Sequence, residues 1–329
     1  MTRRMALYLT LVVGLIVFFT YMIYMPGNSY KGALPTLDDA GHEMARRFES
    51  HVTALCSNPA GRNFIEKQGL AAAKKYIAEQ FKSSGYQVEY QEYQISGDTF
   101  ANIEVTHLGT DYPDEIIVIG AHYDAVIGAP GANDNGSGVA AVLELADRFK
   151  DAELPRSIRF VAFVNEEPPH FMRGSMGSDV YAKHVASKKE NIIAMYSLET
   201  IGYFRDETGS QQYPLLFNLF YPRTGNFIAF VGNLKSRGLV TRSLRSFRAH
   251  ATFPSEGIAA PAIIPGINWS DHRSFWKQGY PAIMITDTAP YRYPYYHTSE
   301  DTPDKVDYEK MVYVVQGIEK MLGEFLLKE

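Results

Sequence analysis

The chain has 329 residues, of which 46% are hydrophobic and 21% are charged, so it can bury a full core. This composition excludes extensive disorder. The net charge of -5 gives no broad basic surface, and we expect no nucleic-acid partner. The single cysteine, Cys56, cannot form an internal disulfide and is interpreted as an ordinary buried thiol.

The first predicted element is a membrane span. Residues 5–25 carry no charge and would extend about 32 Å as a helix, enough to cross the hydrocarbon core of a bilayer. Arg3 and Arg4 precede this run, so the positive-inside rule predicts a cytoplasmic tail, residues 1–4, with the rest of the chain outside the cytoplasm. A cleaved signal peptide and a buried core helix are the alternatives. The length of the run and the lack of a small-x-small cleavage site before Pro26 favour an uncleaved single-pass anchor.

A linker, residues 26–36, leads into one predicted domain, residues 37–329, in which helical and strand-like segments alternate. Helical spacing covers residues 37–56 and 66–84, and strand-like runs follow at 86–95 and 101–108. Mostly continuous apolar runs come next, at 115–124, 157–167, 191–202, 227–233 and 282–288, separated by helical segments at 136–150, 175–187, 236–250 and 305–328. Continuous apolar strands are typical of a sheet covered on both faces. We predict an α/β fold, a single globular domain with a mixed, mainly parallel central sheet flanked by helices.

Acidic and histidine side chains gather where the apolar strands end. They are His122 and Asp124, Glu166 and Glu167, Glu199, and Asp287 with His297 a little beyond. Ligands bind at the carboxyl edge of open α/β sheets, so we expect these residues to converge. Several carboxylates in one crevice repel one another unless a cation lies among them, and zinc accepts both imidazole nitrogen and carboxylate oxygen. The pattern therefore predicts a metal site.

Six motifs carry a resemblance to a known family. They are GAHYD, GANDNGSGVAAVLELA, FVNEEPPHF, SLETIGYF, SDHRSFW and YYHTSEDTPDKVDY. Each alone is weak, but in this order they resemble the zinc aminopeptidases of metallopeptidase family 28 over about residues 40–325. The resemblance implies the aminopeptidase-like fold and a pair of zinc ions.

The resemblance also implies the role of each site residue. His122 with Glu199 would hold one zinc, His297 with Glu167 would hold the other, and Asp134 would bridge the two, with a cis peptide bond after it. Asp124 would accept the second ring hydrogen of His122 and fix its tautomer. Glu166 would be the general base, taking the proton of a metal-bound water as hydroxide attacks the substrate carbonyl.

Several positions keep more than one interpretation. The best-known family members have aspartate at the position of Glu199, so the site would hold one tight and one loose or absent zinc if Glu199 does not coordinate. Asp271 and His272 are expected near the substrate pocket without binding metal. The aromatic run at 291–296 could wall a specificity pocket or pack in the core. His170, His184 and His250 are interpreted as structural or surface residues.

The predicted function is that of a membrane-anchored, zinc-dependent exopeptidase, an aminopeptidase acting on peptides, with its catalytic domain on the extracytoplasmic side. The alternatives are a glutaminyl cyclase-like acyltransferase with one zinc, a carboxypeptidase and a metal-free receptor-like domain. No basic cluster for a substrate carboxylate is identifiable, but Arg173 and Arg292 keep the carboxypeptidase open. Zinc stoichiometry and the hydrolysis of amino-acid amides distinguish them. The sequence sets no oligomeric state and no preferred amino-terminal residue.

Overall fold

The computed structural model describes residues 3–58, 60–214 and 217–327, and in these ranges eight strands form one mixed sheet. The strands are β1 (Glu89–Ile95), β2 (Asp98–His107), β3 (Tyr112–His122), β4 (Arg156–Phe163), β5 (Asn191–Glu199), β6 (Ile228–Gly232), β7 (Ser255–Ala259) and β8 (Ala282–Thr286). Their order across the sheet is β1-β2-β4-β3-β5-β8-β6-β7. The central strands β4, β3, β5 and β8 are parallel, as are β6 and β7, whereas β1, β2 and β4 pair antiparallel and so do β6 and β8. The predicted fold class is confirmed.

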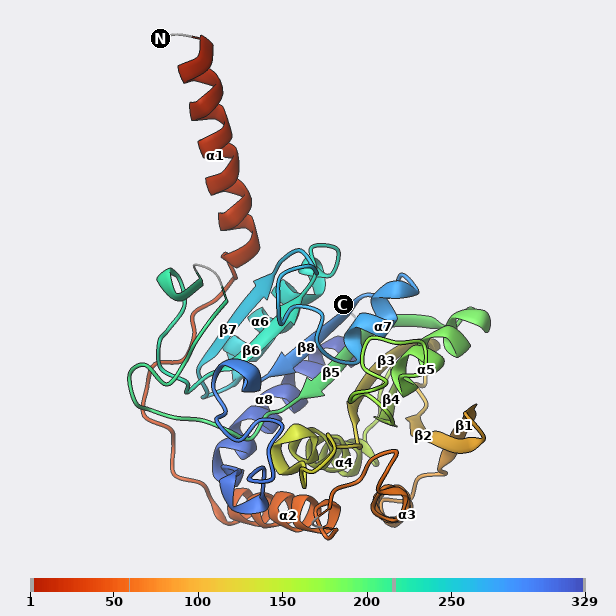
Figure 1. The fold of residues 1–329 in the computed structure, drawn as a ribbon. Helices are drawn as coiled ribbons and strands as arrows, with labels where there is room; N and C mark the ends of the chain where they lie inside the picture. The colour runs from red at the N-terminus through yellow and green to blue at the C-terminus, as the bar shows by residue number, and fades with distance from the viewer. Residues whose placement is uncertain (1–2, 59, 215–216, 328–329) are drawn as a thin grey trace.

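Helices cover both faces of the sheet (Figure 1). The helices are α2 (Asp39–Leu55), α3 (Lys67–Ser83), α4 (Gly138–Phe149), α5 (Gly177–Ser187), α6 (Arg237–His250), α7 (His272–Lys277) and α8 (Tyr308–Leu326). On β3, Ile117 and Ile119 pack in the cluster that contains α2, α3, α4, α6 and α8, while Ile116 and Val118 pack with α5 and α7 on the other face. Successive strand side chains point to opposite faces, which explains the continuous apolar runs.

A strand and a helix were not predicted, and several predicted strands end earlier than expected. The edge strand β7 has the sequence SEGIA, which lacks an apolar run, and α7 is a six-residue helix within the motif SDHRSFW. The strand predicted over 157–167 ends at Phe163, and Asn165 adopts a left-handed conformation with φ 59°. Glu166 and Glu167 therefore lie in a loop beyond β4 and not at the end of the strand itself.

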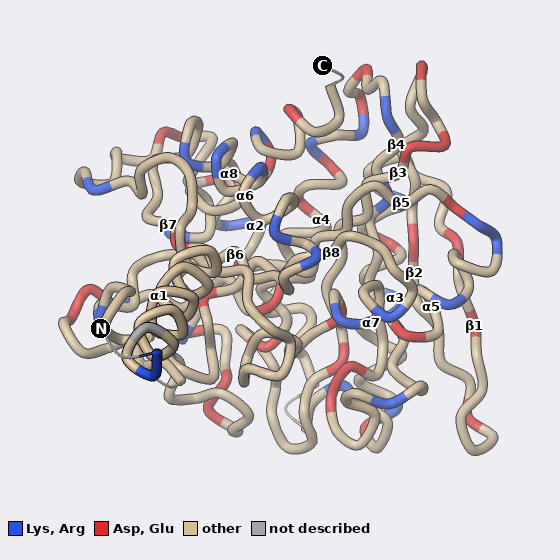
Figure 2. The backbone as a smooth tube through the Cα atoms, turned by 90° about the horizontal axis from the view of Figure 1, so that it is seen from above, with Lys and Arg blue, Asp and Glu red and all other residues tan. Residues whose placement is uncertain are grey.

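The predicted apolar helix, α1 (Arg3–Ile23), projects away from the sheet (Figure 1). Its mean hydropathy is 2.3, and its length and composition are sufficient to cross a membrane. In the described residues, Lys and Arg alternate with Asp and Glu along the backbone (Figure 2).

Candidate metal centre and active site

The predicted site residues converge at the carboxyl edge of the sheet. His122 ends β3 and Glu199 ends β5, while Glu167 follows β4 and His297 follows β8. Asp134 lies in the segment Ala132–Ser137 that precedes α4, and the peptide bond between Asp134 and Asn135 is cis, as expected. Because β4, β3, β5 and β8 are parallel neighbours, their carboxyl ends share one edge.

Among the described residues, two groups of side chains have the spacing of a metal site, and they share Asp134. In the first, His122 Nε2 lies 3.4 Å from Asp134 Oδ1 and 3.3 Å from Glu199 Oε2. In the second, His297 Nε2 lies 3.1 Å from Asp134 Oδ2 and 3.3 Å from Glu167 Oε1. Each carboxylate oxygen of Asp134 thus faces a different imidazole.

The atoms of these groups fit a bound cation. His122 Nε2, both carboxylate oxygens of Asp134 and Glu167 Oε1 are buried, and none has a hydrogen-bond partner within the part of the chain that the structure describes. A buried polar atom left unpaired costs about 1–3 kcal/mol. Imidazole nitrogens and carboxylate oxygens are ligands that zinc accepts, so this donor set suits zinc.

Asp124 makes a different main contact from the one predicted. His122 Nδ1 lies 3.1 Å from the backbone oxygen of Asp124 and 3.6 Å from its carboxylate, so the ring N–H donates to the carbonyl. This bond still fixes the tautomer and leaves Nε2 free to face a metal. The Asp124 carboxylate instead accepts the backbone N–H of Glu166 at 3.0 Å and that of Glu167 at 3.1 Å. It therefore holds the loop that carries the two glutamates.

Burial dominates the electrostatics of the glutamates. Glu166 is 6% exposed and belongs to neither metal group, and burial raises its pKa well above the ordinary value. Burial, with a further contribution from Asp134, raises the pKa of Glu167 to about 7. Burial opposes ionisation of Asp134 too, but the imidazoles of His122 and His297, which face its carboxylate, lower its pKa overall. A buried carboxylate with a raised pKa is suited to accepting and returning a proton near neutral pH.

Glu199 lies in the first group, although its side chain is one methylene longer than the aspartate expected from the best-known family members. Its Oε2 accepts a hydrogen bond from Ser270 Oγ at 2.6 Å and lies beside His122 Nε2, and its side chain is 13% exposed. Ser270 in turn lies 2.9 Å from Ser197 Oγ, which anchors this arrangement on β5. The glutamate is therefore held at the position predicted for a ligand.

Comparison with known proteins places the chain in a family. Residues 102–321 match the sequence profile of peptidase family M28. The chain belongs to this family. It is 37% identical over 320 residues to the uncharacterized protein YfbL of Escherichia coli K12, and the match covers 94% of this chain and 96% of YfbL. Family membership makes it a metallopeptidase of the M28 type.

Solved structures share the fold of this M28 peptidase. The zinc aminopeptidase BSAP of Bacillus subtilis gives a TM-score of 0.69 with 16% identity, covering 86% of this chain and 95% of BSAP. A glutaminyl cyclase of Fimbriiglobus ruber gives a TM-score of 0.64 with 19% identity, covering 93% of this chain and all of the cyclase. At these identities the likeness is one of fold, and both activities occur on it.

Two residues that brace the M28 site were not singled out from the sequence. The Asp301 carboxylate accepts the backbone N–H of Asn133 at 2.8 Å and that of Asp134 at 3.1 Å, and it also accepts the Tyr293 hydroxyl at 2.7 Å. Asp301 stands in the quoted motif YYHTSEDTPDKVDY, so the motif could have indicated it. It fixes the backbone that presents the shared ligand.

Arg62 braces the loop after His122. Its guanidinium is fully buried and donates to the backbone oxygens of Tyr123 at 2.7 Å, Gly131 at 2.7 Å and Pro130. Cys56 is half-buried, not buried as interpreted, and its thiol contacts the same Pro130 oxygen at 3.4 Å. No sequence signal marked Arg62, because its partners are backbone atoms distant along the chain.

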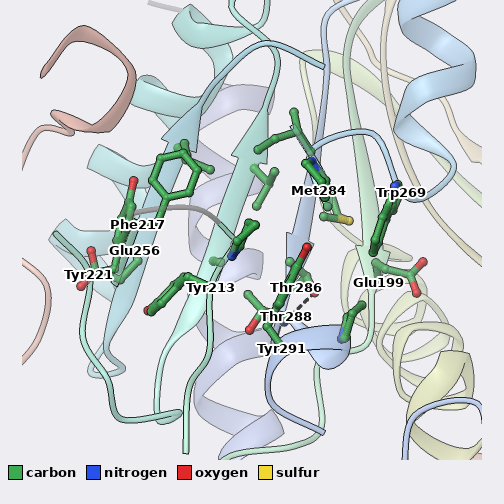
Figure 3. A pocket seen from close by; sticks show the side chains of 18 of the residues that line it. Glu199, Tyr213, Phe217, Tyr221, Glu256, Trp269, Met284, Thr286, Thr288 and Tyr291 are labelled. Carbon is green, nitrogen blue, oxygen red and sulfur yellow. Dashed lines mark hydrogen bonds between the residues drawn. The ribbon is translucent and has the colours of Figure 1, made fainter. Parts of the chain in front are cut away.

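An apolar pocket of about 110 Å³ begins at Glu199. Figure 3 shows Glu199 and Trp269 on one side of it and Phe217 and Tyr221 on the other. From the predicted aromatic run, Tyr291 and Tyr296 line the pocket, and the ring of Tyr296 stacks on His297 at 3.8 Å between centroids.

The remaining predicted residues are mostly structural. Tyr293, also from the aromatic run, packs in the core against Tyr203. Asp271 and His272, predicted near the substrate pocket, are fully buried, and neither is among the residues that line the pocket. His272 contacts the backbone oxygen of Ile267 at 2.8 Å and packs edge-on against Trp276.

Asp287 was predicted at the edge of the site, but it belongs to neither metal group of the described residues. Its carboxylate instead holds the backbone that follows β5. It accepts the N–H of Tyr203 at 2.8 Å and that of Gly202 at 3.2 Å. His170 contacts the Ser175 hydroxyl at 2.9 Å, as a structural histidine would.

Proposed function

We propose that this M28 protein is an aminopeptidase that uses two zinc ions and removes apolar amino-terminal residues from peptides. The observation that carries the proposal is the sharing of Asp134, whose two oxygens face two imidazoles and have no hydrogen-bond partner among the described residues. His122 and Glu199 would hold one zinc, and His297 and Glu167 the other. Metal ions held by these residues would supply Lewis-acid chemistry, polarising the substrate carbonyl and lowering the pKa of bound water.

Glu166 is the proposed general base. Its raised pKa suits it to take a proton from water and to deliver one to the leaving amine, while Asp124 holds its backbone in place. Burial excludes bulk water from this carboxylate, so the proton stays available for the return step. Glu166 and Asp124 are therefore the proposed catalytic and positioning residues of the site.

The pocket beside Glu199 is proposed to take the side chain of the substrate's amino-terminal residue. Its lining includes Phe227, Val231, Met284 and Trp269, which favour an apolar or aromatic side chain. Hydrolysis of leucine amide and phenylalanine amide, compared with the same amides blocked by an amino-terminal acetyl group, tests this assignment. Hydrolysis of the blocked amides at equal rates would contradict an aminopeptidase.

Glu166→Gln tests the mechanism. Zinc content should remain unchanged while kcat falls by about 100-fold or more, because the amide cannot accept the proton. Glu300→Gln, an exposed glutamate near His297, is the matched control and should leave both quantities unchanged. Loss of zinc in Glu166→Gln would mean that Glu166 is a ligand and that the roles of the adjacent glutamates are reversed.

The glutaminyl cyclase alternative has one specific support, the fold likeness to the Fimbriiglobus ruber enzyme. Incubation with a peptide that begins with glutamine separates the two: ammonia release without chain shortening indicates cyclisation, and free glutamine indicates hydrolysis. The carboxypeptidase alternative loses one of its two candidates, since Arg292 is buried and donates to Gln211 at 2.7 Å and to the Phe227 carbonyl at 2.9 Å. A protein that binds no zinc would support the receptor alternative.

We also propose that α1 is retained as a single membrane anchor with the catalytic domain outside the cytoplasm. Burial of Met22, 4% exposed, within the domain supports retention, since cleavage near residue 25 would expose its apolar neighbours. Alkaline extraction of membranes and amino-terminal sequencing test this. A soluble mature chain that begins beyond α1 would show a cleaved signal.

A further inference from the structure

The carboxyl end of α1 is docked onto the catalytic domain. The Arg237 guanidinium lies over the Tyr21 ring, 4.2 Å from its centroid, and donates to the backbone oxygens of Tyr21 at 2.8 Å and Tyr24 at 3.0 Å. Arg248 donates to the backbone oxygens of Pro26 at 3.0 Å and Gly27 at 3.1 Å. Arginine side chains at helix carboxyl ends satisfy carbonyls that the helix leaves unpaired. These contacts fix the direction of α1 relative to the sheet, so the start of the predicted linker is not free.

The docking also sets the depth of neighbouring loops in a bilayer. Phe19 lies four residues before the end of α1, about 6 Å along its axis. Its ring contacts those of Phe217 and Phe220, with 5.7 Å and 4.6 Å between centroids. The 21-residue helix is about as long as the hydrocarbon core is thick. If α1 spans the membrane, Phe217 and Phe220 lie at the boundary between the hydrocarbon and the headgroups.

Exposed apolar side chains stand at the same end of the domain. Leu219 is 69% exposed, Phe220 53% and Ile263 90%, and we refer to these three residues as the apolar rim. Ile264, beside Ile263, packs in the cluster that includes Phe19 and Met22 of α1. The apolar rim therefore continues the lipid-facing surface of α1, and Figure 1 shows α1 leaving the domain next to β7. Burying such side chains in the membrane removes apolar area from water.

The pocket connects this surface to the metal centre. Phe217, adjacent in space to Phe19, lines the pocket on one side, and the segment Ile264–Ile267 lines it beside the apolar rim. Glu199 stands on the opposite side of the same pocket (Figure 3). The residues that line the pocket therefore extend from the contacts of α1 to a proposed zinc ligand.

We propose that the apolar rim inserts into the outer surface of the bilayer, and that the substrates are peptides bound to that membrane surface, whose amino-terminal residues enter the pocket from the lipid side. This inference rests on the proposed peptidase function and on retention of α1. A bilayer is favoured over a protein partner because the rim is continuous with a helix that is itself apolar and exposed over most of its length.

Full-length protein in phosphatidylcholine and phosphatidylglycerol vesicles tests the proposal with two substrates. Both have the same leucine-initiated fluorogenic sequence, and one carries a carboxyl-terminal palmitoyl chain that anchors it in the vesicle. Leu219→Ser combined with Ile263→Ser should lower kcat/KM for the anchored peptide by about tenfold and leave the soluble peptide unchanged. Leu108→Ser combined with Ile65→Ser, which are 70% and 56% exposed at other sites, is the matched control and should change neither. Equal effects on both peptides, or no effect on either, would overturn the substrate assignment.

Membrane insertion has a readout that is independent of catalysis. The fluorescence of a Phe220→Trp variant should be quenched by lipids with brominated acyl chains more strongly than that of the parent chain, which contains Trp269 and Trp276. Absence of additional quenching would refute insertion of the apolar rim. If neither peptide is hydrolysed but quenching occurs, the proposed peptidase function fails while insertion stands.

Discussion

Replacing Asp124 with asparagine tests how the two adjacent glutamates are held. The Asp124 carboxylate accepts the backbone N–H groups of Glu166 at 3.0 Å and Glu167 at 3.1 Å. Asparagine offers a single oxygen, so one N–H would face an amide N–H instead of an acceptor. A hydrogen bond to a charged group contributes roughly 1.5–3 kcal/mol, and every 1.4 kcal/mol corresponds to a tenfold change in an equilibrium constant. We expect zinc affinity and kcat each to fall by about 10- to 100-fold.

The assay measures zinc bound from a buffered zinc solution, together with hydrolysis of leucine amide. The loss should fall on the group of Glu167 and His297, so in a Glu199→Ala background Asp124→Asn should release the zinc that remains. Asp307→Asn is the control, since Asp307 caps α8 by accepting the N–H of Lys310 at 3.0 Å. Retained zinc and activity in Asp124→Asn would refute the reasoning. Preferential loss from the His122 group would show that the carboxylate acts on the imidazole across 3.6 Å.

Three further changes test the ligands and the fold. Glu199→Ala should remove roughly half of the bound zinc, and an unchanged stoichiometry would strike Glu199 from the ligands. Arg62→Met leaves backbone oxygens without their buried donor and should lower the free energy of unfolding by about 3 kcal/mol, measured by urea denaturation, with Arg62→Lys losing less. A loss under 1 kcal/mol would contradict the bracing role. Burial lowers the pKa of His51 to about 4 from an ordinary value of 6.5, so the unfolded chain binds the proton first as pH falls. The stabilising effect of neutral His51 is present above pH 6.5 and is lost as the pH falls from about 6.5 to 4. His51→Gln should therefore flatten the dependence of Tm on pH in that window. Equal slopes of Tm against pH in the variant and the parent chain would show that His51 does not contribute.

The fold and the convergence of the candidate ligands were predictable because both depend on patterns in the local sequence. Apolar runs long enough for buried strands indicate β3, β4, β5 and β8, and the acidic and histidine residues follow their ends directly. Parallel neighbours then bring those ends together without any knowledge of the loops. The edge strand β7 left no such mark, because it contains serine, glutamate and glycine and only part of it is buried.

The bracing contacts were not predictable, because they depend on how loops cross in space. Asp124 stands two residues after His122, and in a continuing strand both side chains would lie on one face. The strand instead ends at His122, and the Asp124 carboxylate turns to the loop after β4. Arg62 contacts backbone oxygens around residue 130, a choice that carries no side-chain signature. The type of a side chain indicates which chemistry it can perform. Which backbone oxygens it will contact depends on the folded structure and cannot be predicted from the residue type.

The buried carboxylates give a physical argument for metal that is independent of the motifs. Glu166 and Glu167 are each almost fully buried, and burial raises the pKa of both, that of Glu167 to about 7. A proton therefore competes with a cation for the Glu167 carboxylate near neutral pH, and zinc binding must release protons and weaken as the pH falls. A receptor-like domain would gain stability by replacing such buried charges with apolar side chains. These acids and two imidazoles surround the unpaired oxygens of Asp134, and a bound cation would satisfy them, as the proposed function requires.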